Sequence, residues 1–242
     1  MHAALESDAA HHVTVVASSG DTGVISRPCP GTSPTASWVP VRETNMPAED
    51  PLVLSAGGTT LVANHTTGAY LGETAWSYPD ATQGSGGGFS RLFSRPAYQA
   101  GVPGTEVMRG VPDVAADSDG RTGLAVIVSD GGQQVTVFGA KGTSASAPLW
   151  SAVIALADQS AGRDLGFVNP AIYRIARDAG NREAFHDITQ GTNTVQISGV
   201  TITGYRSTPG WDPVTGWGSP DARVLVPLLA RYARPEVTRS GR

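Results

Sequence analysis

The sequence has little cysteine, little lysine and little charge. Its single cysteine, Cys29, excludes an intrachain disulfide framework and a cysteine-based zinc site. Charged residues make up 16% of the chain, compared with roughly 25% in an average globular domain. The formal net charge is −4, and Lys141 is the only lysine. Because no basic stripe precedes the C-terminal tail, we expect no nucleic-acid partner.

Long apolar runs are absent as well. No run reaches the roughly 18 residues that a transmembrane helix requires, so we expect no membrane partner. The first residues have no basic segment followed by an apolar one, which predicts that this chain carries no signal peptide. The 242 residues are nevertheless 40% hydrophobic, enough for the core of a folded domain. The 30 glycines and 17 prolines predict many tight loops.

Apolar runs and helical periodicity predict an α/β fold. We expect the end of a helix in residues 1–12, followed by strands at 13–17, 52–56 and 123–129. Residues 134–138 are expected to pair with the last of these strands across a tight turn. Helices are predicted at 145–159, 169–177 and 222–233, and loops at 26–47, 62–106 and 187–221. Strands that alternate with helices indicate a mainly parallel sheet flanked by helices.

The helix predicted at 145–159 carries the first candidate site. Apolar residues and alanines dominate it, so we expect it to be almost wholly buried, with Pro148 in its first turn. Ser144 directly precedes it, after Gly142 and Thr143. The N–H groups and the dipole at the start of a helix favour developing negative charge, which suits a nucleophilic serine. The alternative is that Ser144 only caps the helix.

Asp21 is the second candidate, in a Ser-Gly-Asp turn directly after the strand predicted at 13–17. The carboxyl ends of parallel strands are where α/β proteins place their sites. A carboxyl group there could take part in catalysis. The alternative is an aspartate in an ordinary turn.

Asp187 and Asp212 are the third candidate. The second of them lies in segment 208–212 of the glycine-rich loop 187–221, and backbone carbonyls of this loop could join the two carboxylates. Such an all-oxygen set suits calcium, which prefers six or more oxygen ligands. The alternative is two loop aspartates without a metal.

Together these motifs resemble the sedolisin family, the serine-carboxyl peptidases with a subtilisin-like fold. The matching segments follow the family's order and cover nearly the whole chain from residue 13: 13–23 (VTVVASSGDTG), 56–61 (AGGTTL), 111–119 (VPDVAADSD), 142–150 (GTSASAPLW), 165–170 (LGFVNP), 185–189 (FHDIT) and 210–220 (GWDPVTGWGSP). The resemblance implies a partial peptidase domain over 1–233, a calcium-binding loop region over 185–221 and a disordered tail over 234–242.

The resemblance also implies roles for individual residues. Ser144 matches the nucleophile that forms the acyl-enzyme, and Asp21 matches the carboxyl group that, when protonated, helps to hold the oxyanion. One calcium ion is implied, with ligands from the side chains of Asp187 and Asp212 and the carbonyls of Ile188, Thr208 and Gly210. The family usually has glycine where Thr208 stands. Peptide or protein substrates and an extracellular location are implied as well.

The family's general base is not found in its expected place. The family carries it as Glu-x-x-x-Asp, well upstream of the Ser-Gly-Asp turn, and only 18 residues precede Ser19 here. The one match in the chain is Glu183 with Asp187, whose aspartate belongs to the calcium pattern. Glu6 and Asp8 are two residues apart and would lie on different helix faces.

The resemblance therefore predicts the C-terminal portion of a catalytic domain, truncated at its N-terminus. Such a chain would be inactive alone, because a serine without a base is a poor nucleophile. A missing N-terminal half, encoded upstream or separately, is a possible partner. The alternative reading is a non-catalytic calcium-binding remnant or interaction module.

Overall fold

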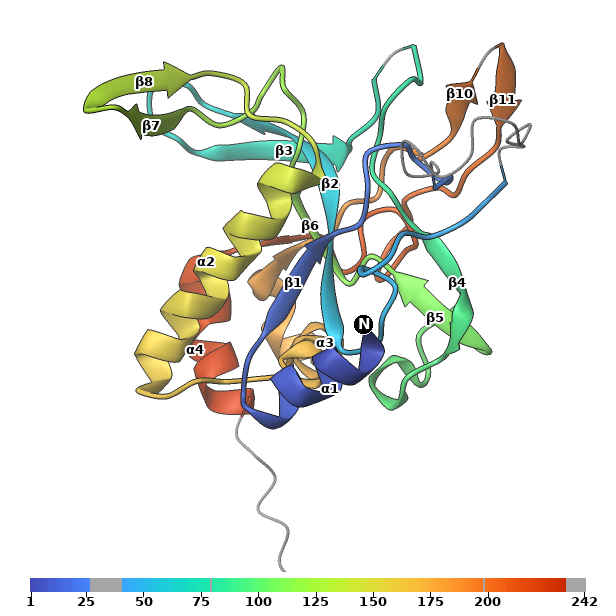
Figure 1. Ribbon diagram of the computed structural model, residues 1–242, viewed down its shortest axis with the longest axis vertical. Coiled ribbons are helices and arrows are strands. Elements are labelled where there is room, and N and C mark those ends of the chain that lie inside the picture. The colour runs from blue at the N-terminus through green and yellow to red at the C-terminus, as the bar shows by residue number, and fades with distance from the viewer. Residues whose placement is uncertain (27–40, 79, 198, 234–242) are drawn as a thin grey trace, which may run out of the picture.

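A parallel sheet forms the centre of the computed structural model (Figure 1), which describes residues 1–26, 41–78, 80–197 and 199–233. Its strands run in the order β1 (Val15–Ser18), β2 (Val53–Ala63) and β6 (Val114–Asp117). β3 (Tyr70–Ala75) pairs antiparallel with the second half of β2. The mainly parallel α/β architecture expected from the sequence is confirmed.

The helices cover and flank this sheet. They are α1 (His2–Ala10), α2 (Thr143–Ala161), α3 (Asn169–Arg177) and α4 (Ala222–Tyr232), with short 3₁₀ turns η1 (Ala97–Gln99) and η2 (Ala179–Ala184). α2 packs against β1, β2, β6 and α4. The Trp150 indole donates to the carbonyl of Ala115 at 2.9 Å and so fastens α2 to β6. No described helix is both long and apolar enough to cross a membrane.

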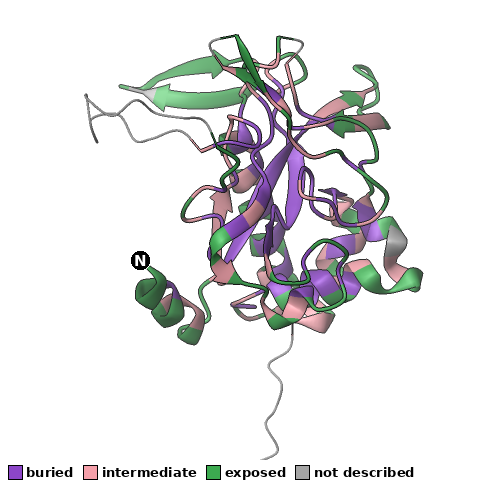
Figure 2. Cartoon of the chain, turned by 90° about the vertical axis from the view of Figure 1, so that its right-hand side faces the viewer, coloured by how far each residue is buried: buried purple, intermediate pink, exposed green. Residues whose placement is uncertain are grey.

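Several smaller elements surround the core. They are β4 (Gly88–Ser94) with β5 (Met108–Val111), β7 (Val126–Asp130) with β8 (Gln133–Val137), β9 (Phe185–His186) with β12 (Ser219–Pro220), and β10 (Val195–Ile197) with β11 (Val200–Ile202). Figure 2 shows the buried residues concentrated in the central sheet and the helices beside it, whereas the projecting hairpins are exposed.

Three expectations about strands are wrong. The segments 62–106 and 187–221, predicted as loops, contain strands: β3 and β4 in the first, and β10, β11 and β12 in the second. Tertiary pairing overrides their loop-like composition. The 123–129 segment lies outside the central sheet, in the β7–β8 hairpin, where Ile127 is 66% exposed. The third parallel strand is β6, whose two alanines make its apolar run easy to overlook.

The expectation that α2 is almost wholly buried is also wrong. Its second face leaves Ser151, Ala152, Ala155 and Leu156 exposed, Leu156 to 50%. Asp158 is the only charged residue in the helix. An exposed helix face normally carries charged residues. This face has instead the composition of a buried face, although no described residues cover it.

The start of α2 differs from the prediction by two residues. The helix begins at Thr143, so Pro148 lies inside it rather than in its first turn. Proline has no N–H group, so the carbonyl of Ser144 lacks its usual helical donor. Cys29, much of the predicted loop 26–47 and the predicted tail 234–242 lie outside the described residues.

Candidate active site

Ser144 lies in the first turn of α2 and is exposed. Gly142 precedes the helix with φ 84° and ψ 164°, a conformation that essentially only glycine adopts. The Gly142 N–H donates to the carbonyl of Ser118 at 2.8 Å, which ties the start of α2 to the end of β6. Within the described residues the Ser144 hydroxyl has no hydrogen-bond partner.

Asp21 reaches the start of the same helix from the end of β1. Its Oδ1 atom accepts a hydrogen bond from the Thr143 N–H at 2.7 Å and another from the Thr143 hydroxyl at 2.8 Å. The Thr143 hydroxyl also accepts from the Gly20 N–H at 3.1 Å. The fold therefore brings together Asp21 and Ser144, which are distant in sequence.

The two oxygens of Asp21 differ in their surroundings. Oδ1 accepts both bonds from Thr143, whereas Oδ2 has no hydrogen-bond partner among the described residues. An oxygen that accepts two hydrogen bonds is a poor place for a proton, so a protonated Asp21 carries its proton on Oδ2. In that state Asp21 is a hydrogen-bond donor next to the start of α2.

Two residues that the sequence analysis did not single out build this site. Thr143 holds Asp21, and Asn45 holds the turn before it by donating from Nδ2 to the Ser19 carbonyl at 2.9 Å. Thr143 is part of the Gly-Thr-Ser motif, but its partner Asp21 is evident only in the structure, where the turn after β1 meets the start of α2. Asn45 follows no sequence pattern that would indicate its position.

Gly142→Ala should destabilise the fold and disturb Asp21. A Cβ atom at this position would lie 2.6 Å from Asp21 Oδ2, in addition to the strain of the positive φ. We expect a loss of roughly 1–3 kcal/mol in the free energy of unfolding, measured by urea denaturation. Gly162→Ala, at the other end of α2, is the matched control, with φ 65° and open space around the new Cβ. Equal losses for the two variants would contradict the contact with Asp21.

No described carboxylate is in hydrogen-bond contact with the Ser144 hydroxyl. Glu6 belongs to α1 and its side chain is 63% exposed. Figure 1 shows α1 beside the lower end of β1, whereas α2 begins at the upper end of the sheet. Glu183 is exposed in η2, just before Asp187. Neither residue is placed to act as the base.

The calcium candidates converge on one loop. Asp187 accepts a hydrogen bond from the Gly210 N–H at 3.0 Å, and Asp212 accepts from the Thr208 N–H at 3.3 Å. Asp187 and Gly210 line a cavity of about 490 Å³. The structure thus brings both predicted carboxylates into contact with segment 208–210.

The oxygen atoms of this loop region suit a cation. Within the described residues no donor bonds to the carbonyl oxygens of Ile188, Thr208 or Gly210. None of the ion pairs in the described part of the chain involves Asp187 or Asp212. Asp212 is 1% exposed, and this burial raises the pKa of its carboxyl to about 6 despite hydrogen bonds from Thr215 and its neighbours.

Acidic side chains alone could not hold a metal here. The described residues contain no group of three or more His, Cys, Asp or Glu side chains suited to one. A cation between Asp187 and Asp212 would therefore depend on the three free carbonyls as well. Calcium accepts such mixed oxygen ligands readily, so the residues present fit it.

Comparisons with known proteins find relatives that match nearly the whole chain. Kumamolisin from Bacillus sp. (strain MN-32) is 39% identical over 245 residues, which cover 97% of this chain and 40% of that protein. Sedolisin from Pseudomonas sp. (strain 101) is 35% identical over 93% of this chain and 36% of its own length. Tripeptidyl-peptidase 1 from Rattus norvegicus is 32% identical over 91% of this chain and 38% of its own.

A solved structure matches the fold. Pseudomonas sedolisin, a serine-carboxyl proteinase complexed with two molecules of pseudo-iodotyrostatin, superposes with a TM-score of 0.76 and 29% identity. The match covers 96% of this chain and 60% of that one. No family model matches the chain. The chain spans about 40% of the length of the curated relatives.

The fold is the subtilisin-like α/β fold of the matched sedolisin structure. The relatives found by sequence identify the family. The chain belongs to the sedolisin family of serine-carboxyl peptidases.

Proposed function

We propose that this chain supplies the nucleophile and the oxyanion-binding carboxyl of a peptidase that hydrolyses peptide bonds at acidic pH. The observation that carries the proposal is the pair of hydrogen bonds from Thr143 to Asp21, which holds a carboxyl group beside the exposed Ser144 at a helix N-terminus. The test is peptide hydrolysis by the chain joined to the N-terminal part of a family catalytic domain, compared with Ser144→Ala.

The reaction follows from the roles of these groups. The Ser144 oxygen attacks the carbonyl carbon of the peptide while its proton passes to a carboxylate base. The carbonyl oxygen becomes an oxyanion, which accepts a hydrogen bond from protonated Asp21 Oδ2. The C–N bond then breaks, the amine leaves with the proton from the base, and water hydrolyses the acyl-enzyme.

Acidic conditions suit both carboxyl groups in this scheme. A neutral carboxylic acid donates a hydrogen bond and a carboxylate cannot, so Asp21 must be protonated. A carboxylate base with a pKa near 4 is also matched to acid. An extracellular or otherwise acidic place of action is part of the proposal.

The base is expected from a polypeptide that packs on β1 and α2. Within the described residues β1 pairs only with β2, and all four β1 residues are half-buried. The uncovered apolar face of α2 lies next to it, and a groove of about 340 Å³ runs between them, with Val16 and Ala155 in its lining. The solved sedolisin chain extends well beyond the matched 60%. We infer that a segment equivalent to that remainder covers this surface.

Ala155→Arg tests this surface. A long charged side chain would fill the groove and would have to be desolvated on docking, which is strongly unfavourable even where Asp158 or Asp164 in the lining can pair with it. We expect at least about a hundredfold loss of affinity for a separately supplied N-terminal part, measured by isothermal titration calorimetry.

Ala100→Arg is the control for this substitution. Ala100 is exposed and lies outside the groove. If the Ala155→Arg variant binds the N-terminal part with unchanged affinity, the proposed docking surface is wrong. This result does not depend on any measurement of catalysis.

Calcium is the proposed cofactor, bound by Asp187, Asp212 and the carbonyls of Ile188, Thr208 and Gly210. Its role would be structural, because the ion would join the segment after β9 to the 208–212 loop. The free carbonyl oxygens of these residues support the assignment.

Calcium should raise the melting temperature of the chain. An ion that binds only the folded state stabilises it by RT ln(1 + [L]/Kd), roughly 2.7 kcal/mol at a hundredfold excess over Kd. Asp187→Asn should lose most of this increase, because the amide can still accept from the Gly210 N–H but has no charge. A melting temperature of the unsubstituted chain that is the same with calcium and with chelator would contradict the site.

A second candidate function is a non-catalytic calcium-binding module. It is favoured because no carboxylate of the described residues is in hydrogen-bond contact with the Ser144 hydroxyl, and because the loop of Asp187 and Asp212 has carbonyl oxygens without donors. In that case calcium would stabilise the chain, and no added N-terminal part would produce Ser144-dependent hydrolysis.

A further inference from the structure

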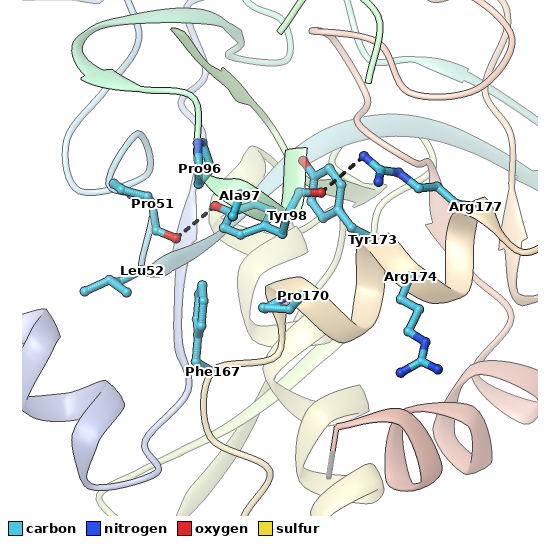
Figure 3. A pocket seen from close by; sticks show the side chains of 10 residues that line it. All are labelled: Pro51, Leu52, Pro96, Ala97, Tyr98, Phe167, Pro170, Tyr173, Arg174 and Arg177. Atoms are coloured by element: carbon cyan, nitrogen blue, oxygen red, sulfur yellow. Dashed lines mark hydrogen bonds between the residues drawn. The ribbon is translucent and has the colours of Figure 1, made fainter. Parts of the chain in front are cut away.

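A second cavity, of about 520 Å³, lies at the opposite end of the central sheet from Ser144 (Figure 3). Pro51 and Leu52 in its wall directly precede β2, which places it at the amino ends of the parallel strands. Asp21 and Ser144 lie at the carboxyl ends. Its lining residues are Pro51, Leu52, Pro96, Ala97, Tyr98, Phe167, Pro170, Tyr173, Arg174 and Arg177.

The walls of this cavity are apolar and already held in place. Three prolines limit the backbone, and the Tyr98 ring lies 5.8 Å from the Phe167 ring and 4.9 Å from the Tyr173 ring. The Tyr98 hydroxyl donates to the Pro51 carbonyl at 2.8 Å. The Tyr173 hydroxyl donates to Asp113 at 2.8 Å. Because both hydroxyls are engaged, the tyrosines offer a ligand mainly their ring surfaces.

The polar part of the cavity has one sign of charge. Arg174 and Arg177 line it, and no aspartate or glutamate does. Neither arginine takes part in an ion pair in the described part of the chain. Arg177 donates to the carbonyls of Tyr98 at 3.2 Å and Ala100 at 2.6 Å. Arg174 lies over the Tyr232 ring, 4.9 Å from its centroid. In Figure 3 both side chains extend from α3, but the Arg177 guanidinium lies beside Tyr98 and Tyr173, whereas that of Arg174 points away from these rings, toward Tyr232 of α4.

We propose that this cavity binds a carboxylate carried on a flat apolar group. The ring would pack between the proline and aromatic walls. The carboxylate would form charge-assisted hydrogen bonds with the guanidinium of Arg174, which would turn toward the cavity from its place over the Tyr232 ring. Two sources share this chemistry: a free arylalkanoic acid, and the C-terminal phenylalanine of a peptide. In a peptidase the second source would make the cavity a site for peptide ends, remote from Ser144.

The experiment compares three probes by isothermal titration calorimetry at about pH 6, where simple carboxylic acids are ionised. They are 3-phenylpropionate, its uncharged amide, and N-acetyl-glycyl-phenylalanine. The titrations use residues 1–242 both alone and joined to the N-terminal part, with folding checked by thermal melting. We expect saturable millimolar binding of the two acids and about tenfold weaker binding of the amide.

Arg174→Gln should weaken the acids about tenfold and leave the amide unchanged. Arg174 is the better choice for substitution because Arg177 also lines the cavity beside Asp187. Arg223→Gln is the control, since Arg223 is 88% exposed and pairs with Asp221 at the start of α4. Tighter binding of the peptide than of 3-phenylpropionate assigns the site to peptide C-termini, and the reverse assigns it to free acids.

Three outcomes would overturn the proposal: no saturable binding of either acid, equal binding of acid and amide, or an Arg174→Gln variant that binds the acids as well as the control. Failure here leaves the peptidase proposal intact, because hydrolysis is measured at the other end of the sheet.

Discussion

Joined to a family N-terminal part that carries Glu-x-x-x-Asp, the chain should hydrolyse peptides in acid, and Ser144→Ala should lower kcat roughly 10⁴- to 10⁶-fold. Without the serine oxygen no acyl-enzyme can form, and only oxyanion stabilisation and substrate binding remain. The assay is peptide hydrolysis between about pH 3 and pH 7, the range in which a carboxylate base titrates.

Two controls accompany this prediction. Ser160→Ala removes an exposed hydroxyl from the far end of the same helix and should leave kcat unchanged. Residues 1–242 alone should show no turnover above that of Ser144→Ala. Ser144-dependent turnover by the chain alone would show that a base exists within it, and Glu6 and Glu183 would be the first residues to substitute. Full activity of the joined Ser144→Ala variant would reject Ser144 as the nucleophile.

Asp21→Ala in the joined enzyme should lower kcat by roughly 10²- to 10³-fold, the usual effect of removing one oxyanion donor. The loss should appear in kcat more than in KM, because the hydrogen bond to the oxyanion exists only in the transition state. Steady-state kinetics with a soluble peptide measures both constants.

Asp21→Asn separates the donor role from the structural one. An asparagine can accept from Thr143 through Oδ1 and donate from the position of Oδ2 at any pH, whereas aspartate donates only when protonated. We therefore expect Asp21→Asn to retain much more activity than Asp21→Ala and to keep it at higher pH. An Asp21→Asn variant that retains activity but shows the pH profile of the unsubstituted enzyme would mean that Asp21 acts only by holding Thr143, and equal losses of kcat in the two variants would contradict the donor role.

The candidate residues could be proposed from the sequence because each stands at the end of a predictable element. Ser144 stands at the start of a strongly apolar helix, and Asp21 stands directly after a β-branched strand, so each residue has a defined place relative to its own element. The helices α3 and α4 were predicted nearly to the residue, because caps and apolar periodicity are properties of short segments.

Strand pairing between distant segments was harder to predict from the sequence. β3 and β4 were hidden in a glycine-rich stretch, and β6 was passed over in favour of the more hydrophobic β7. Strand formation depends on which partner lies alongside, and a segment's own composition contains little information about that partner.

The sequence by itself indicated the class of fold, and its resemblance to the family selected Ser144, Asp21 and the two carboxylates proposed for calcium. Only the tertiary structure decided that Thr143 holds Asp21 by Oδ1 and leaves Oδ2 free, that three carbonyls near Asp187 lack donors, and that one face of α2 lies uncovered beside β1. The reason is physical: a residue's chemistry is set by its side chain, whereas its partners and its burial are set by segments that meet only in the folded chain.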